Sequence, residues 1–345
     1  MTAPQIRLGV AGLGLAGRMV AGSLDLDNRV AIVAAADPQQ NARREFAAGR
    51  GVVMYPDVDG LCRDPMVDAV WVASPTRFHR RHVELAAEGG KDIIVEKPMA
   101  PSVADCDAMI AAAAKAGVLL LAAGVRSLDP TFDAMREVVE SGALGRLRHL
   151  SASAYTGWLR RDRSEADMDE SLGGGVVFNQ APHQVDVLRC LAGGRAVRSV
   201  RARAAAWSDR TPATGYFRAE LELEDDVDAV LAYDGHGYLR SAELVASGGS
   251  ASLVLADAGL VVASGSRGAV RPAGDHLDLV SDDGHSRIPI RPGDATTEAV
   301  SQLMAARTVG GAAPRHSGDW GRGTLEVVAA IVESARAGLR VPLRT

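Results

Sequence analysis

The sequence contains few cysteines, few aromatic residues and no long uninterrupted apolar run. The three cysteines, Cys62, Cys106 and Cys190, are widely spaced and form neither a Cys-x-x-Cys pair nor a cluster with histidine, so we expect buried thiols rather than disulfides or a zinc site. Aromatic residues make up 4% of the chain and show no pattern typical of RNA stacking. No apolar run approaches the roughly 18 residues of a membrane-spanning helix. We therefore expect no metal, no nucleic-acid partner and no membrane partner.

Length and charge are those of an ordinary globular chain. The 345 residues are too many for one small core and predict two domains. Hydrophobic residues make up 47% and charged residues 23%, and the formal net charge of −5 gives no general attraction for nucleic acid or an anionic membrane. Residues 1–9 lack the basic and apolar regions of a signal peptide, so we expect a cytoplasmic protein.

A glycine-rich turn follows the first apolar segment. Residues 6–11 are expected to form a strand, and the turn after them opens a helix through about Leu24. Glycines permit a tight turn and close approach of the backbone to a pyrophosphate, whose charge is favoured at a helix N-terminus. The motif alone is weak in a chain with 37 glycines, and its position between strand and helix strengthens it. The predicted cofactor-binding residues of this turn are Gly12, Leu13, Gly14, Leu15, Ala16 and Gly17.

An acidic residue ends the second predicted strand, at residues 30–36. Asp37 stands 25 residues after Gly12, where a carboxylate can accept hydrogen bonds from both adenosine ribose hydroxyls and would repel a 2′-phosphate. This favours NAD as the cofactor. Arg43 and Arg44 follow in the next helix, where they either receive the phosphate of NADP or lie on a solvated helix face.

Glu96 and Lys97 end another apolar segment, at residues 93–95, and Pro98 stops it. A lysine before a proline is usually a solvated turn residue, but at the carboxyl end of a strand in an open α/β sheet it projects toward the ligand crevice. Strands are also expected at 67–73 and 118–123, with helices between. This alternation predicts an α/β Rossmann domain, a doubly wound parallel sheet, over residues 1–124.

The pattern changes after Gly124. A helix is expected from Pro130 to about Ser141, and many short strands separated by Gly and Asp turns predict an α+β domain over residues 125–345 with a large, mainly antiparallel open sheet. A last helix at 319–339 is expected to pack against the body of the protein. The predicted strands are 146–155, 197–207, 216–223, 228–233, 243–246, 251–256, 259–263 and 276–280.

A segment with catalytic residue types follows the glycine run at 173–175. If it is helical, Asn179, His183 and Asp186 share one face, and Pro182 suits a first helical turn. Asp186 either orients His183 or caps local structure. A histidine on such a face is more often structural, and the distant Glu96-Lys97-Pro98 favours catalysis here.

Three segments together resemble the Gfo/Idh/MocA family of nicotinamide-dependent oxidoreductases, and the resemblance extends over nearly the whole chain. They are the glycine turn, Glu96-Lys97-Pro98 and Asn179-Gln-Ala-Pro-His183-Gln-Val-Asp186. The resemblance implies that Lys97 and His183 are catalytic: His183 removes the hydroxyl proton and Lys97 stabilises the charge on the same oxygen. It also implies cofactor contacts by Glu96 and Lys97 and by the loop after the strand at 67–73, although His79 alternatively packs its helix. The residues of that loop are Ser74, Pro75, Thr76 and His79.

Asn179 departs from the commonest family pattern, which has aspartate there. A neutral amide cannot accept a proton but can donate a hydrogen bond to substrate, which points away from a sugar or inositol site with a Lys-Asp-His triad. Three segments resemble the subgroup that includes phthalate cis-4,5-dihydrodiol dehydrogenase: the residues around Asn179, the segment 155–163 and His316-Ser-Gly-Asp-Trp320.

A cluster of arginines and aromatics precedes the catalytic segment. Guanidinium groups bind carboxylates in pairs of hydrogen bonds and aromatics stack, so these residues either clamp a carboxylated ring or form a solvated loop balanced by the acidic residues of 162–170. Arg126 is a further anion contact, and His316 either faces the site or has a surface role. The predicted substrate-binding residues are Asn179, Arg126, Tyr155, Trp158, Arg160 and Arg163, with Arg161 beside them.

These features predict an NAD(P)-dependent oxidoreductase that acts on a CH–OH group of a small polar or carboxylated cyclic substrate. A cis-dihydrodiol carboxylate is the specific version. The alternatives are a sugar or polyol dehydrogenase of the same family, a non-catalytic NAD(P)-binding sensor and an NAD-dependent glycosidase. A broad open sheet needs its face covered, so we expect a homodimer or homotetramer.

Overall fold

The chain divides into two compact units in a computed structural model. The model describes residues 5–124, 126–160, 162, 168–169, 174–208, 211–238, 260–308, 311 and 313–343. The first unit comprises Met1–Gly124 and Asp294–Gly323, and the second comprises Val125–Gly293 and Thr324–Thr345. The segment Asp294–Gly323, assigned to the second domain from the sequence, thus groups with the first unit.

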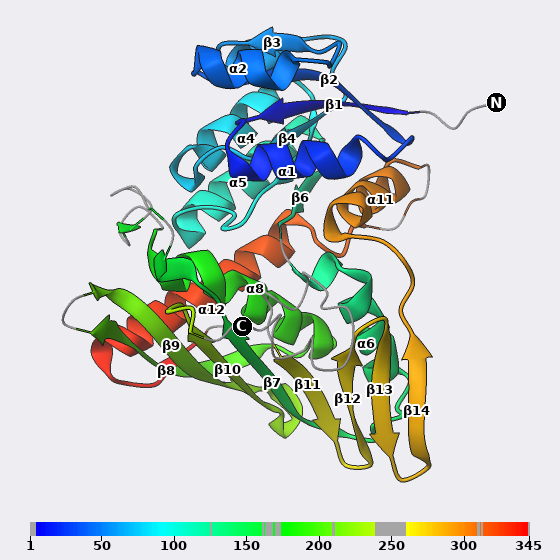
Figure 1. The fold of residues 1–345 in the computed structure, drawn as a ribbon, viewed down its shortest axis with the longest axis vertical. Helices are drawn as coiled ribbons and strands as arrows, with labels where there is room; N and C mark the ends of the chain where they lie inside the picture. The colour runs from blue at the N-terminus through cyan, green and yellow to red at the C-terminus, as the bar shows by residue number, and fades with distance from the viewer. Residues whose placement is uncertain are drawn as a thin grey trace. The chain divides into compact units, whose positions relative to one another are not determined.

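The first unit is built on a six-stranded parallel sheet in the order β3-β2-β1-β4-β5-β6, which confirms the predicted doubly wound fold (Figure 1). Strand β4 is buried along its whole length, and three of the four residues of β5 are buried, because helices cover both faces of such a sheet. The short edge strand β3 was not predicted. The strands are β1 (Ile6–Ala11), β2 (Val30–Ala36), β3 (Val53–Tyr55), β4 (Ala69–Val72), β5 (Asp92–Val95) and β6 (Leu120–Ala122).

The helices of the first unit lie between these strands, with one addition from late in the chain. Ser102 caps α5, since its hydroxyl accepts a hydrogen bond from the Asp105 backbone N–H at 3.1 Å. The helices are α1 (Leu15–Leu24), α2 (Gln40–Ala47), α3 (Val58–Arg63), η1 (Thr76–Phe78), α4 (His79–Glu88), α5 (Val103–Ala116) and α11 (Ala295–Arg307).

Polar contacts explain why the late segment joins the first unit. Arg29 Nη1 donates to Ser301 Oγ at 2.8 Å, and Arg307 Nε lies 2.7 Å from Asp92 Oδ2. Beyond α11, Ser317 forms an antiparallel bridge with Leu121 of the edge strand β6. Helix α11 was not predicted because its apolar residues do not form a strong one-sided pattern, and these contacts span most of the sequence.

The second unit contains a nine-stranded sheet in the order β14-β13-β12-β11-β7-β10-β9-β8-β15 (Figure 1). Among the described strand pairs of this second sheet only β7 and β10 run parallel, so the mainly antiparallel prediction is confirmed. The predicted strands at 243–246 and 251–256 lie outside the described residues, and β12, β14 and β15 were not predicted. The strands are β7 (Leu147–Tyr155), β8 (Val197–Ser208), β9 (Thr211–Leu223), β10 (Asp228–Asp234), β11 (Leu260–Gly265), β12 (Gly268–Ala273), β13 (His276–Ser281), β14 (Gly284–Pro289) and β15 (Val341–Pro342).

Helix α8 is the buried helix of this unit, and nearly all its residues are inaccessible to solvent. It begins at Gly175, so the prediction that Pro182 occupies a first helical turn is wrong. Pro182 lies inside the helix, where it has no N–H to donate to the carbonyl of Phe178 four residues earlier. The other helices described wholly within this unit are η2 (Arg126–Leu128), α6 (Pro130–Glu140), η3 (Trp158–Arg160) and η5 (Glu224–Asp226), and α12 (Gly318–Ala337) contains the boundary between the two units.

Candidate active site

Four adjacent strands of the first sheet each end in a predicted site residue. Gly12 follows β1, Asp37 follows β2, Ser74 comes shortly after β4, and Glu96 follows β5. The sheet order β2-β1-β4-β5 places these strand ends side by side. Chain order reverses between β1 and β4, and in open α/β sheets a ligand crevice lies outside the carboxyl ends at such a reversal.

The glycine turn is tightly packed at Gly12 and open at Gly14. Gly12 has φ +99°, and a Cβ there would lie 2.7 Å from the backbone nitrogen of Ser74, so only glycine allows these two strand exits to touch. A Cβ on Gly17 would lie 2.0 Å from the Gly12 carbonyl oxygen. At Gly14, which caps α1, a Cβ would meet nothing within 4 Å. The turn therefore leaves space at the N-terminus of a ten-residue helix, which suits a phosphate group.

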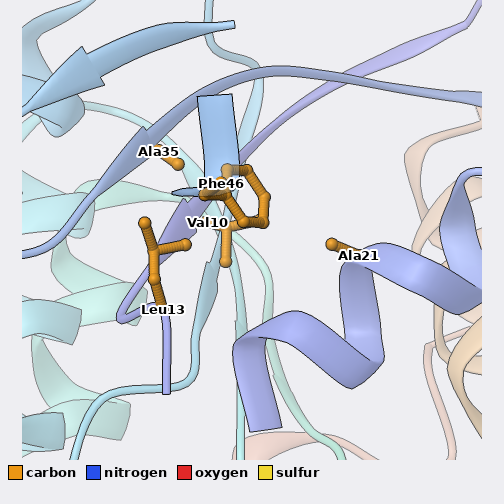
Figure 2. Close-up of a cluster of buried hydrophobic side chains, with 5 residues drawn as sticks. All are labelled: Val10, Leu13, Ala21, Ala35 and Phe46. Atoms are coloured by element: carbon orange, nitrogen blue, oxygen red, sulfur yellow. The ribbon is translucent and has the colours of Figure 1, made fainter. Parts of the chain in front are cut away.

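A buried hydrophobic cluster and a carboxylate both hold the turn in place. Figure 2 shows Val10, Leu13, Ala21, Ala35 and Phe46, the buried residues of this cluster. The backbone N–H of Leu13 donates to Asp37 Oδ2 at 2.9 Å, and the N–H of Gln39 donates to Asp37 Oδ1 at 2.8 Å. Each carboxylate oxygen has a second lone pair, so Asp37 keeps acceptor capacity for a ribose hydroxyl.

The two arginines after Asp37 differ in their surroundings. Arg43 Nη1 donates to the backbone carbonyls of Asp37 at 2.6 Å and of Pro38 at 3.0 Å. Arg44 is exposed. Arg43 is thus held against the backbone of this loop.

Two histidines hold Ser74. Nε2 of His79 contacts the Ser74 carbonyl oxygen at 2.7 Å, and Nδ1 of His82 contacts its hydroxyl at 2.8 Å. His79 is 1% exposed, and its Nδ1 also lies 3.1 Å from the carbonyl oxygens of Pro98 and Met99. His79 therefore links the loop after β4 to the loop that carries Lys97. Pro75 is exposed and Thr76 is half-buried beside it.

Burial acts on the protonation of both histidines. It lowers the pKa of His79, although the backbone carbonyls around the ring oppose this effect. Burial, together with the neighbouring His79 and Arg81, lowers the pKa of His82 to about 4. His82 is therefore neutral near pH 7. Its contact with Ser74 was not anticipated, because Ser74 lies in the loop before α4 and no helical spacing relates it to His82.

Lys97 follows Glu96, whose carboxylate is held by a side chain of the neighbouring strand β4. Trp71 Nε1 of β4 donates to Glu96 Oε1 at 3.2 Å. Lys97 is half-buried, and the peptide bond between Lys97 and Pro98 is cis. The first unit thus contains Lys97 and every predicted cofactor-binding residue.

His183 lies in α8 of the second unit and is 4% exposed. Asn179, one turn earlier, is half-buried, and its Oδ1 accepts a hydrogen bond from Gln180 Nε2 at 2.7 Å. Asp186 is fully buried and its Oδ2 accepts a hydrogen bond from the Ser127 backbone N–H at 2.9 Å. Asp186 thus binds backbone at the start of η2, a contact consistent with the predicted capping role.

Gln184, next to His183, ties α8 to the sheet. Its Nε2 donates to the carbonyl of Ala152 in β7 at 3.0 Å and to that of Ala232 in β10 at 2.8 Å. These are the two strands of the parallel pair. The rotation of α8 about its axis, and with it the direction of His183, is thereby fixed.

The predicted substrate-binding residues around η3 form an aromatic and cationic group in the second unit. Arg160 Nε donates to the His236 carbonyl at 2.8 Å, and its guanidinium lies 5.1 Å above the Tyr238 ring. Trp158 is buried, whereas Tyr155 is half-buried at the end of β7. Arg161 and Arg163 lie outside the described residues. Arg126, in η2, is half-buried.

Three further aromatic residues, Trp207, His236 and Tyr238, belong to this group and were not anticipated. The His236 ring lies 4.8 Å from the Trp207 ring and 3.9 Å from that of Tyr238, which is 72% exposed. They come from separate strands and loops, so no local spacing could have indicated them. His316, by contrast, is buried in the first unit against Gln302 and Trp320, so a surface role for it is wrong.

Within the described part of the chain, no group of three His, Cys, Asp or Glu side chains could hold a metal ion. In the same residues, no helix combines the length and the apolar character required to cross a membrane. All three cysteines are buried free thiols, as expected, and burial raises the pKa of Cys62 and of Cys106 to about 12.

Comparison with known proteins gives matches along most of the chain. Residues 6–124 match the NAD-binding Rossmann-fold model of the Gfo/Idh/MocA oxidoreductase family, and residues 132–269 match the C-terminal domain model of the same family. A Bordetella bronchiseptica RB50 protein of known crystal structure superimposes with a TM-score of 0.91 at 29% identity, covering 98% of this chain and 100% of that one.

Two curated relatives have named activities. The chain is 36% identical over 241 residues to 1-carboxy-3-chloro-3,4-dihydroxycyclohexa-1,5-diene dehydrogenase of Comamonas testosteroni, covering 70% of this chain and 60% of that protein. It is 32% identical over 190 residues to myo-inositol 2-dehydrogenase of Thermotoga maritima, covering 54% and 55%. The matches therefore span 55 to 60% of these relatives' lengths.

Proposed function

The chain belongs to the Gfo/Idh/MocA family of oxidoreductases, and on this premise we propose that it is an NAD(P)-dependent dehydrogenase acting on a CH–OH group of a small cyclic molecule. The observation that carries the proposal is the row of strand ends in the first sheet. The open turn at Gly14, the carboxylate of Asp37, the Ser74 loop and Lys97 follow adjacent strands around the reversal of chain order. A dinucleotide site with a lysine at the same sheet edge fits hydride transfer from an alcohol.

NAD is the proposed cofactor. The space at Gly14 and the absence of any Cβ contact there fit a pyrophosphate, and the nicotinamide, when bound, supplies the hydride acceptor. The Asp37 carboxylate, held beside the turn, accepts ribose hydroxyls and repels a 2′-phosphate. Arg43 is engaged with backbone carbonyls, which leaves Arg44 as the nearby arginine for the phosphate of NADP, the alternative cofactor.

We propose that Lys97 and His183 act on the same substrate oxygen. The ammonium group of Lys97 donates a hydrogen bond to this oxygen and stabilises the negative charge that develops as the proton leaves. His183 takes that proton on its imidazole, while the carbon loses a hydride. The hydride carries away two electrons and the imidazole holds the proton, so the alcohol becomes a carbonyl. Asn179 donates a hydrogen bond to substrate rather than serving as a base.

The proposed substrate is a carboxylated cyclic diol, a cis-dihydrodiol carboxylate in the specific form. The name of the Comamonas relative describes a molecule of that kind, a carboxylated ring with two hydroxyl groups. In this chain we assign the carboxylate to Arg160 and Arg126, with Tyr155 and Trp158 beside the ring. Arg163 joins this set as predicted from sequence. A polyol is the second candidate, since the Thermotoga relative is named for myo-inositol.

The experiment is reduction of NAD and NADP, followed by absorbance, with cis-dihydrodiol carboxylates, inositols and aldoses offered separately. Turnover of the carboxylated compounds supports the specific proposal, and turnover of polyols alone replaces it with the second candidate. Lys97→Met and His183→Ala should each reduce kcat at least about 100-fold, and His183→Ala, which is not a predicted cofactor contact, should retain NADH binding. Full turnover by either variant would refute the assigned roles, and cofactor binding without turnover of any alcohol would favour a sensor.

We also propose a homodimer or homotetramer. Tyr216 of β9 and Val230 of β10 are each 37% exposed, and in β10 exposed residues alternate with buried ones, which is typical of a sheet with one uncovered face. Sedimentation equilibrium tests this. A monomer at all concentrations would refute it.

A further inference from the structure

Trp71 is an unusual residue for its place in the fold. It lies in the middle of the buried strand β4, opposite Ile94 of β5, and is 1% exposed. An aliphatic side chain would fill such a position without any polar atom. A buried indole N–H needs an acceptor, and that of Trp71 donates to Glu96 Oε1 at 3.2 Å. Glu96 and Ile94 lie on the same face of the sheet because side chains alternate along a strand.

Gly124 bounds the same carboxylate on the other side. It follows β6, the strand next to β5, and has φ +70°. A Cβ at position 124 would lie 1.9 Å from Glu96 Oε2 and 3.1 Å from Lys97 Cγ. The carboxylate of Glu96 therefore occupies the space that a side chain at 124 would need. Neighbours on both sides, from β4 and from the exit of β6, define its position.

This arrangement has a specific consequence for the residues at the end of β5. A glutamate at a strand end has several rotamers, and fixing one of them costs side-chain entropy each time a ligand binds. The indole of Trp71 removes that cost in advance because the hydrogen bond exists in the folded protein. Lys97 gains as well, since its aliphatic stem lies beside Gly124 next to the fixed carboxylate.

We propose that Trp71 is a positioning residue that acts through Glu96: its indole N–H holds the carboxylate in the orientation that binds the cofactor. The inference rests on the proposed function and on the sequence-based expectation that Glu96 contacts the nicotinamide nucleotide. Trp71 is 1% exposed, so we assign it no direct contact with substrate or cofactor. Its contribution is therefore to cofactor affinity, and it should vanish when the carboxylate can no longer reach the indole.

The test is a double-mutant cycle on the full chain, with NADH affinity measured by calorimetry and thermal unfolding recorded in parallel. Trp71→Phe keeps an aromatic ring but removes the N–H, and Glu96→Asp keeps the charge but withdraws the carboxylate by one methylene. Each single variant should weaken NADH binding about tenfold, which corresponds to roughly 1.4 kcal/mol, and the double variant should be no weaker than Glu96→Asp alone. Trp320→Phe, the same change in the same unit against His316, should leave NADH affinity within about twofold.

Three outcomes would overturn the inference. If Trp71→Phe binds NADH as the wild type does, or if the two effects multiply in the double variant, Trp71 does not act through Glu96. If Trp71→Phe unfolds, Glu96→Asp still decides: unchanged NADH affinity in that variant overturns the inference, because Trp71 is intact but out of reach. A wild-type chain that fails to bind NADH or NADPH overturns the proposed function itself, and the inference with it.

Discussion

Replacing Gln184 by methionine tests whether its amide anchors α8. Methionine has nearly the same volume and length, so the substitution removes two N–H donors with little change in packing. The carbonyls of Ala152 and Ala232 then lose a buried donor each. An orphaned buried acceptor costs about 1–3 kcal/mol, so the two together cost roughly 2–6 kcal/mol.

One compensating gain reduces this figure. Gln184 Oε1 is buried with no hydrogen-bond partner among the described residues, and methionine removes that unsatisfied oxygen. The gain is about 1–3 kcal/mol, so the expected net loss in the free energy of unfolding is about 2 kcal/mol. Gln184→Glu should lose more, since a carboxylate brings no donor and sets negative charge against two carbonyl oxygens.

Urea unfolding followed by circular dichroism measures these differences. Gln40→Met, the same change at an exposed position of α2, is the control and should stay within about 0.5 kcal/mol of the wild type. Because α8 carries His183, Gln184→Met should also lower kcat while NADH affinity, which depends on the first unit, is unchanged. Equal stability of the wild type and Gln184→Met, or greater stability of Gln184→Glu than of Gln184→Met, would refute the reasoning.

Three further predictions concern the first unit. Gly12→Ala should lower the free energy of unfolding by at least about 2 kcal/mol and abolish NADH binding in calorimetry, because the new Cβ combines φ +99° with a 2.7 Å approach to the Ser74 backbone. The pKa of His82, lowered to about 4 mainly by burial, lies below its unfolded value near 6.5, so stability is fully present above pH 6.5 and falls as the pH drops toward 4. His82→Gln should show a smaller slope of unfolding free energy over that interval, and an unchanged slope would contradict a buried neutral ring. Hydrogen bonds from Arg7 lower the pKa of Asp68, so Asp68→Asn should cost about 1 kcal/mol at pH 7 in urea unfolding, a difference that disappears as the pH falls below about 4.

Local patterns were sufficient to predict the strand ends of the first unit. Gly12 and Asp37 directly follow buried apolar runs, and Lys97 comes two residues after one. All three therefore lie close to the end of a parallel strand. A strand followed by a turn and a helix has a pattern that extends over few residues. Its position can therefore be inferred without knowing what packs against it.

Contacts that depend on distant packing could not be predicted in this way. The bond from Trp71 to Glu96 joins residues 25 apart, and that from Arg29 to Ser301 joins residues 272 apart. Helix α8 shows the same limit locally: Pro182 indicates a helix start, but the buried face of α8 stabilises the helix from Gly175 onward and outweighs the lost hydrogen bond. The aromatic neighbours of Arg160 were missed because they come from β8 and the loop after β10.

The return of Asp294–Gly323 to the first unit affects how the chain can fold during synthesis. When residue 124 has left the ribosome, all six strands of the first sheet are available, but α11 and the bridge from Ser317 to Leu121 are not. The edge of β6 then lacks its partner, and an uncovered strand edge pairs readily with other chains. The first unit, although it begins the sequence, is completed only after the whole nine-stranded sheet except β15 has been translated. A fragment that ends at Gly124 should therefore be prone to aggregate.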